Sequence, residues 1–260
     1  ERLLLPAVEG GFRSFGDIAA SGTDAVFAST ERNGLDFDIY KANLETAETE
    51  MLFEGTFGFF AGAISPDGKY VTVTETVGED SDNLYLLDLS NGDMTTVSAP
   101  EPRANHGDGG AEWLPDSSGF YFASNMDREF SAIHFYDVAA QETSLVIETP
   151  RDTGGLELCG TEGGHLAFTE NVEGFHTLHV RNLATGEALD TPRLDEGVYG
   201  LSCAPGTDRM AIRVNGWRTP GDITVWYMAA NTISRTFEAN LAGLDAERFI
   251  RPESIRITAS

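Results

Sequence analysis

The sequence predicts an all-β fold, a β-propeller of about five complete four-stranded antiparallel blades plus a partial outer strand at the N-terminus. Three observations predict it. One strand pattern returns every 44 to 49 residues, a second pattern keeps the same period, and turn residues separate short alternating segments. Helical periodicity is confined to one stretch near the C-terminus, LAGLDAERF (241–249).

The first repeated pattern is a short apolar strand that follows a turn, as in SPDGKYVTVT. Its aligned positions are Phe27, Val73, Phe122, Phe168 and Ile212. The intervals between them are 46, 49, 46 and 44 residues, which is the length of a propeller blade.

The second pattern lies in a different strand, as in LYLLDLSNGD and LHVRNLATGE. Its aligned positions are Asn43, Asp88, Asp137, Asn182 and Tyr227, at intervals of 45, 49, 45 and 45 residues. Because two series in different strands stay in phase, we interpret the period as structural. Stacked β-sandwiches, the alternative, have no reason to keep one period.

Each repeat is interpreted as four strands whose alternation puts one face of the sheet into each core between neighbouring blades. An apolar strand enters the turn, the two patterned strands follow, and a turn such as SNGD or ATGE leads to a fourth strand, MTTVSA (94–99) or ALDTPR (188–193). Residues 1–240 are predicted to form the propeller. The outer strand RLLLPAV (2–8) is either completed by the C-terminal region or belongs to a blade that begins upstream.

The chain is strongly acidic, with 42 Asp and Glu against 17 Lys and Arg and a formal charge of −25. Such a charge repels nucleic acid and anionic lipid, so we expect neither as a partner. No apolar run reaches the length of a membrane helix, and a cytoplasmic location is expected. Two of the basic residues are lysines, which favours a halophilic source over an acidic mesophilic protein.

The two cysteines, Cys159 and Cys203, fall at matching positions of neighbouring repeats, in the apolar slot that Ile64 fills in another repeat. We expect buried free thiols there. A disulfide is the less favoured alternative, since equivalent positions in adjacent blades are expected to be too far apart for a bond.

The repeats, and above all the C-terminal segment GLDAERFIRPESIRITAS, resemble the amino-terminal propeller of the prolyl oligopeptidase family of serine peptidases, in its acylaminoacyl and dipeptidyl peptidase branch. In that family the last blade runs into a linker with the same pattern. The matching residues here are Gly243, Leu244, Asp245, Phe249, Pro252, Glu253 and Arg256. The resemblance implies that residues 241–260 lead toward an α/β-hydrolase domain that this chain does not contain.

The GxSxG turn that presents a hydrolase nucleophile does not occur in the sequence. We therefore expect no catalytic residue in this chain, while the resemblance implies that the parent protein is a serine peptidase. The implied function is a non-catalytic cap that restricts substrate size to short peptides. The alternative is a free-standing TolB-like propeller that acts as a protein-interaction module.

None of the five histidines occurs in a sequence pattern that indicates a catalytic triad of nucleophile, base and acid. We expect neither a metal nor a cofactor. His165 is expected at the surface. His176 and His179 are three residues apart on a predicted strand and thus on opposite faces, which disfavours a metal pair.

The acidic segment GEDSDN (78–83) lacks a calcium-loop pattern and is interpreted as a solvated loop. GDGGAEW (107–113) lacks the lysine of a phosphate loop.

The loop SNMDREFSA (124–132) is the candidate binding segment. A charged surface loop is the simplest interpretation. An Arg-Glu-Phe sequence at this place is a feature of the family, so the resemblance implies substrate binding by Arg128 and Glu129. Arg128 would pair with a carboxylate and Glu129 would receive a peptide amino terminus.

Overall fold

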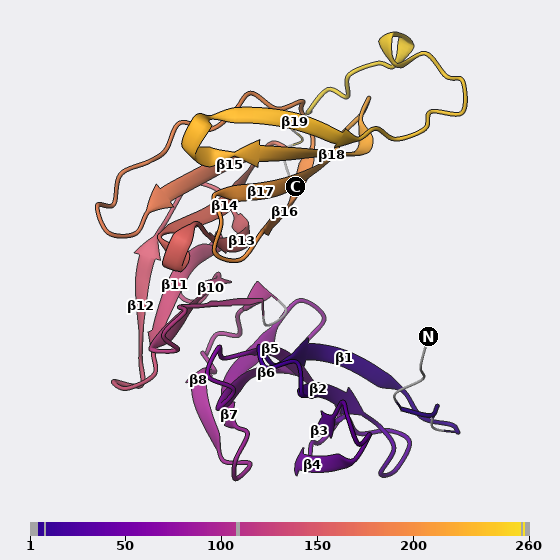
Figure 1. The fold of residues 1–260 in the computed structure, drawn as a ribbon, viewed down its shortest axis with the longest axis vertical. Coiled ribbons are helices and arrows are strands. Elements are labelled where there is room, and N and C mark those ends of the chain that lie inside the picture. The colour runs from indigo at the N-terminus through magenta and orange to yellow at the C-terminus, as the bar shows by residue number, and fades with distance from the viewer. Residues whose placement is uncertain (1–4, 8, 108–109, 256, 258–260) are drawn as a thin grey trace. The chain divides into compact units, whose positions relative to one another are not determined.

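The computed structural model describes residues 5–7, 9–107, 110–255 and 257. It confirms the all-β prediction, with antiparallel sheets whose strands lie in chain order (Figure 1). The chain divides into two compact units, residues 1–148 and 149–260, and each is described by itself. Within the described residues, none of the helices is long and apolar enough to span a membrane.

Residues 1–148 contain three four-stranded sheets, which we call the first, second and third blades. The first blade consists of β1 (Arg13–Ile18), β2 (Asp24–Ser29), β3 (Asp38–Asn43) and β4 (Thr49–Phe53). The second consists of β5 (Phe59–Ile64), β6 (Tyr70–Thr76), β7 (Asp82–Asp88) and β8 (Met94–Ser98). The third consists of β9 (Ala111–Trp113), β10 (Gly119–Ser124), β11 (Ala132–Asp137) and β12 (Glu142–Ile147).

Residues 149–260 contain the fourth and fifth blades. The fourth consists of β13 (Thr153–Cys159), β14 (His165–Val172) and β15 (Phe175–Asn182). The fifth consists of β16 (Val198–Cys203), β17 (Arg209–Asn215), β18 (Pro220–Tyr227) and β19 (Thr232–Phe237). Short 3-10 helices are η2 (Thr161–Gly163), η3 (Met228–Ala230) and η4 (Ala246–Arg248), the last within the stretch expected to show helical periodicity.

Both repeated patterns lie where the sequence predicts them, in the second and third strands of the blades. Alternation along these strands builds a core between neighbouring blades. In β6, Val71 and Val73 are fully buried against the first blade, while Leu84 and Leu86 of β7 pack on the third blade. In the second unit, Ala167 and Val180 pack against the fifth blade. Within each unit, neighbouring sheets therefore cover each other's apolar faces.

A buried aspartate at the start of the third strand ties the end of its own blade together. Asp38 is fully buried, and its Oδ1 accepts the N–H of Gly55 at 2.9 Å just beyond β4. At the corresponding position of the fifth blade, Asp222 accepts the N–H of Ala239 at 2.9 Å just beyond β19. These carboxylates satisfy backbone donors that no neighbouring strand can pair.

A second recurring contact joins the first strands of adjacent blades. Asp17 of β1 accepts the N–H of Ile64 in β5 at 3.0 Å. Glu157 of β13 accepts the N–H of Cys203 in β16 at 3.1 Å. Burial raises the pKa of Glu157, and the hydrogen bond from Cys203 opposes that rise.

The prediction of free thiols was wrong, because Cys159 and Cys203 form a disulfide. Their Cα atoms are 5.4 Å apart, within the range that a disulfide spans. Cys159 ends β13 and Cys203 ends β16, and the Glu157 contact holds these two strands together. The spacing argument failed because first strands of neighbouring blades converge, whereas the later strands diverge.

The predicted fourth strand ALDTPR was also wrong. After a bridge between Arg181 and Ala188, and a hydrogen bond from the Leu189 N–H to the Val180 carbonyl, no further pairing with β15 is described. Pro192 has no N–H to donate and restrains the residue before it, which disfavours continued pairing with β15. Residues 188–196 instead run as an irregular segment along the fourth blade.

The expected outer strand over residues 2–8 falls mainly outside the described residues. Its described part, Leu5 to Ala7, is not in a strand. Leu5 packs against Phe27, Tyr40 and Ala42 on the face of the first blade. The boundary predicted at residue 240 is not tested by these observations.

Candidate functional site

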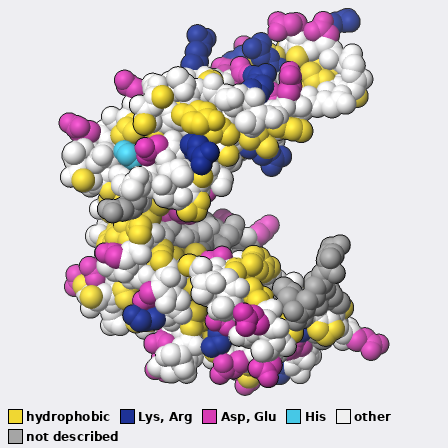
Figure 2. Space-filling model, in the orientation of Figure 1, with side chains coloured by type: hydrophobic (Ala, Val, Ile, Leu, Met, Phe, Trp, Pro, Cys, Tyr) yellow, Lys and Arg dark blue, Asp and Glu magenta, His cyan; other side chains and the backbone are white. Residues whose placement is uncertain are grey.

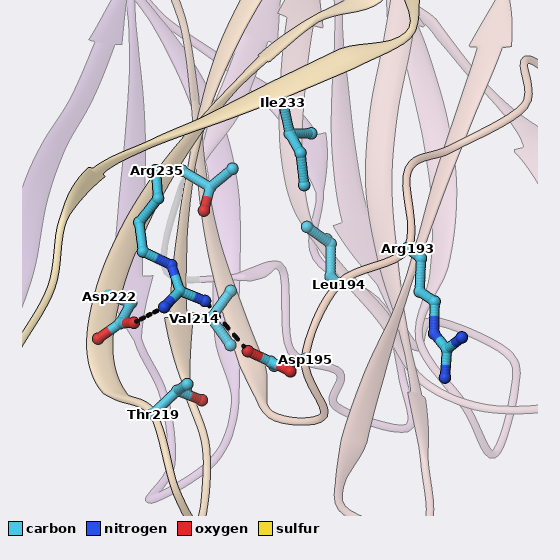
Figure 3. Close-up of a pocket in the computed structure, with 9 residues that line it drawn as sticks. Arg193, Leu194, Asp195, Val214, Thr219, Asp222, Ile233 and Arg235 are labelled. Carbon is cyan, nitrogen blue, oxygen red and sulfur yellow. Dashed lines mark hydrogen bonds and ion pairs between the residues drawn. The ribbon is translucent and has the colours of Figure 1, made fainter.

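The irregular segment 188–196 leaves a cavity of about 240 Å³ between itself and the fifth blade. Arg193, the last residue of the expected fourth strand, and the two residues after it line one side of the cavity. Figure 3 shows the side chains around the cavity. The lining residues are Arg193, Leu194, Asp195, Val214, Thr219, Asp222, Thr224, Ile233 and Arg235.

Arg235 of β19 is the central charge of this cavity and reaches between two carboxylates (Figure 3). Its Nη1 lies 3.4 Å from Asp222 Oδ2, and its Nη2 lies 3.4 Å from Asp195 Oδ2. Arg218 approaches the other oxygen of Asp195 at 3.7 Å. The site thus combines guanidinium donors with carboxylates at the edge of an apolar core.

The tail that follows β19 is fastened beside this cavity by Arg251. Its Nε and Nη2 donate to the two oxygens of Glu196 at 2.7 and 3.0 Å, and its guanidinium lies 5.2 Å from the Phe175 ring centre. The hydrogen bonds from Arg251 lower the pKa of Glu196. Tail residues 251–254 line a second cavity of about 470 Å³ with His176 and Tyr199.

The tail contacts one defined end of the fourth and fifth blades. Phe175 follows the β14–β15 turn, Arg218 lies in the β17–β18 turn, and Glu196 lies in the connection to β16. We call this the loop end of a blade, where its second strand turns into its third. Arginine side chains gather around the tail in Figure 2, and ten of the 17 basic residues, all of them arginines, lie in 149–260.

The predicted binding residues Arg128 and Glu129 lie in the β10–β11 loop, at the loop end of the third blade. Arg128 Nη2 donates to Glu148 Oε2 at 2.8 Å, just beyond β12. Glu129 is exposed. The guanidinium is therefore held by a residue of its own blade, and the predicted substrate-binding role stays a prediction.

His106 and Asp82 form a contact that the sequence analysis missed. The GEDSDN segment is not solvated throughout, because Asp82 is buried and accepts the His106 N–H at 2.6 Å. His106 is fully buried, and its Nδ1 lies 3.2 Å from Asp82 Oδ1. Its Nε2 has no hydrogen-bond partner among the described residues.

The remaining histidines have separate surroundings. Burial lowers the pKa values of His134 and His176, and the Nδ1 of His176 accepts the Tyr199 N–H at 3.0 Å. His179 Nε2 lies 3.1 Å from Glu170 Oε2. His165, expected at the surface, is half-buried. Across the described ranges, no group of three or more His, Cys, Asp or Glu side chains is placed to hold a metal.

Sequence reasoning did not single out the residues of the cavity at Arg235. One signal was available, since TPRL interrupts the expected fourth strand with a proline. A second signal was the pair of opposite charges, Asp222 and Arg235, in two strands whose residues otherwise alternate between apolar and polar. The contacts themselves depend on how the segment 193–195 packs, which no local pattern encodes.

Comparisons with known proteins identify the fold. No family model and no curated protein matches the chain. Among solved structures, TolB from Acinetobacter baumannii aligns with a TM-score of 0.59 and 17% identity over 86% of this chain. Prolyl oligopeptidase B from Galerina marginata aligns with a TM-score of 0.72 and 14% identity over 91%. A structure from a study of two prolyl endopeptidases aligns with a TM-score of 0.66 and 12% identity over 92%.

These identities are too low to show more than the fold, so the chain is a β-propeller of the kind found in TolB and in prolyl oligopeptidases. It spans 53% of the TolB chain, 35% of the Galerina enzyme and 43% of the prolyl endopeptidase. The aligned regions therefore make up about half or less of each of those proteins.

Proposed function

We propose that this chain is the non-catalytic propeller of an oligopeptide-cleaving serine peptidase. In the parent protein it would lie against an α/β-hydrolase domain and admit short peptides while excluding folded proteins. Steric restriction of this kind needs no reactive group on the propeller. A covered active site also excludes bulk water and adds binding surface for the substrate.

The observation that carries the proposal is the course of the tail. β19 finishes at the loop end of the fifth blade, and the segment that resembles the family's linker is held there by the Arg251–Glu196 pair. A domain connected through this tail would follow from the loop end of the fifth blade. The Arg128–Glu129 loop occupies the loop end of its own blade, the third, and we propose that it binds peptides there.

The test is to express the coding sequence that contains this chain together with whatever follows Ser260, and to assay it on short peptides and on folded proteins. We expect cleavage of the short peptides alone. A downstream region without a GxSxG turn, or equal cleavage of folded proteins, would contradict the proposal. The TolB similarity favours the interaction module in that case, and capture of a specific protein partner by the 260-residue chain would test it.

The role of the predicted loop can be tested in the same active protein. We expect E129A to raise KM for peptides with a free amino terminus, with little effect on N-acetylated peptides. R128A removes the pair with Glu148, so E148A is the matched control. If R128A and E148A change peptide turnover equally, Arg128 acts by holding its own loop and not by binding substrate.

A further inference from the structure

The cavity around Arg235 has the chemistry of a binding site that is separate from peptide cleavage. We propose that it binds a small carboxylate carried on an aliphatic body, the chemistry shared by N-acylated aliphatic amino acids and the C-terminal residue of a peptide. Four features carry this inference: the departure from the repeat, the loose pairing of Arg235, two unpartnered donors and an apolar floor.

Arg235 can be compared with Arg32, which pairs with the corresponding aspartate of the first blade. Arg32 donates to both oxygens of Asp38 at 2.9 Å and to the Gly55 carbonyl at 3.0 Å, so its donors are well used. Arg235 makes contacts of 3.4 Å to Asp222 and to Asp195, with exposed Glu238 at 3.9 Å. Arg235 thus fills the same role as Arg32 with longer contacts. Its N–H groups can therefore still donate to an anionic ligand.

Two further donors line the same cavity. Thr219 is 7% exposed, and its Oγ1 is buried without a hydrogen-bond partner in the described structure. A buried hydroxyl without a partner is unfavourable, so the position favours an occupant that can accept its hydrogen bond. Arg193 is exposed and forms no ion pair with any described residue, and it stands across the cavity from Asp222 in Figure 3.

The floor of the cavity is apolar and small. Leu194, Val214 and Ile233 contribute aliphatic side chains beside these donors. A volume of about 240 Å³ suits a ligand below the usual size of a drug-like molecule. Asp195 and Asp222 share the Arg235 guanidinium, and Asp195 is also paired with Arg218, so Arg193 is the lining guanidinium that has no ion pair with a described residue. A ligand with one carboxylate and a branched aliphatic group satisfies both parts of the lining.

The test is a two-dimensional NMR titration of the intact 260-residue chain with N-acetyl-leucine. We expect saturable shifts in the amide signals of residues 193–195, 219 and 235. Three control compounds are compared with N-acetyl-leucine. N-acetyl-leucinamide lacks the carboxylate, acetate lacks the aliphatic body, and inorganic phosphate carries a different anionic group and no aliphatic body. We expect each of these three to bind at least about tenfold more weakly, since each loses one set of contacts.

Variants distinguish the cavity from a general charge effect. R193Q and T219V are expected to weaken N-acetyl-leucine binding about tenfold and several-fold, respectively. T219S keeps the hydroxyl and is expected to retain binding, and R213Q removes a charge from β17 outside the cavity as the control. Equal binding of the amide, equal loss in R213Q, or no saturable shift with any probe would overturn the proposal. None of these results depends on peptide cleavage.

Discussion

Reduction of the disulfide between Cys159 and Cys203 is expected to destabilise residues 149–260 by about 4 kcal/mol. The magnitude follows from the sequence separation of 44 residues. Closing a loop of that length lowers the entropy of the unfolded chain by about 13 cal/mol/K, which corresponds to ~4 kcal/mol at 25 °C. The bond joins the first strands of the fourth and fifth blades, which also share an apolar core, so its loss weakens one of several contacts between them.

Urea unfolding with and without reductant measures this effect. With a urea dependence of ~2 kcal/mol/M, the midpoint of the transition should fall by about 2 M on reduction. The fluorescence of Trp226, buried in the core between these blades, reports on the unit. The C159A/C203A protein is the control, because reductant should leave its midpoint unchanged.

The reasoning is refuted if a free-thiol assay shows full reduction while the midpoint stays the same. The result also bears on location, which the sequence analysis expected to be cytoplasmic. Disulfides persist mainly in oxidising compartments. Recovery of the oxidised form from cells lysed with a thiol-blocking reagent would favour such a compartment over the cytoplasm.

Three further outcomes are expected. Burial raises the pKa of Glu157, so the folded state loses stability as the pH rises from the pKa of Glu157 in the unfolded chain to its higher pKa in the folded chain. In E157Q the melting temperature should depend less on pH in that range. D38N should lower the free energy of unfolding by roughly 2 kcal/mol in urea melts, because it removes the charge of buried Asp38 from its hydrogen-bonded pair with partly exposed Arg32, whereas exposed D80N should change it by less than about 0.5 kcal/mol. The melting temperature should rise from low to molar salt, as screening reduces repulsion within a chain of charge −25; an unchanged value would count against a halophilic source.

The sequence by itself determined the period, the second and third strands of each blade and the cores between neighbouring blades. These features are encoded locally, because alternation along a strand and turn residues at its ends act over a few residues. Val71 and Val73 alternate with Thr72 and Thr74 along β6, and this alternation places the two valines together on the face that packs against the first blade.

The tertiary structure decided the features that depend on which strands meet. The disulfide forms because β13 and β16 converge, and Asp82 is buried because His106 returns beside it. The candidate cavity forms where residues 193–195, which follow Pro192 and belong to no strand, lie beside Ile233 and Arg235 of β19. These contacts depend on distances between segments that are far apart in the chain. A repeating sequence pattern predicts the strands that all blades share, but it does not predict contacts that occur in one blade alone.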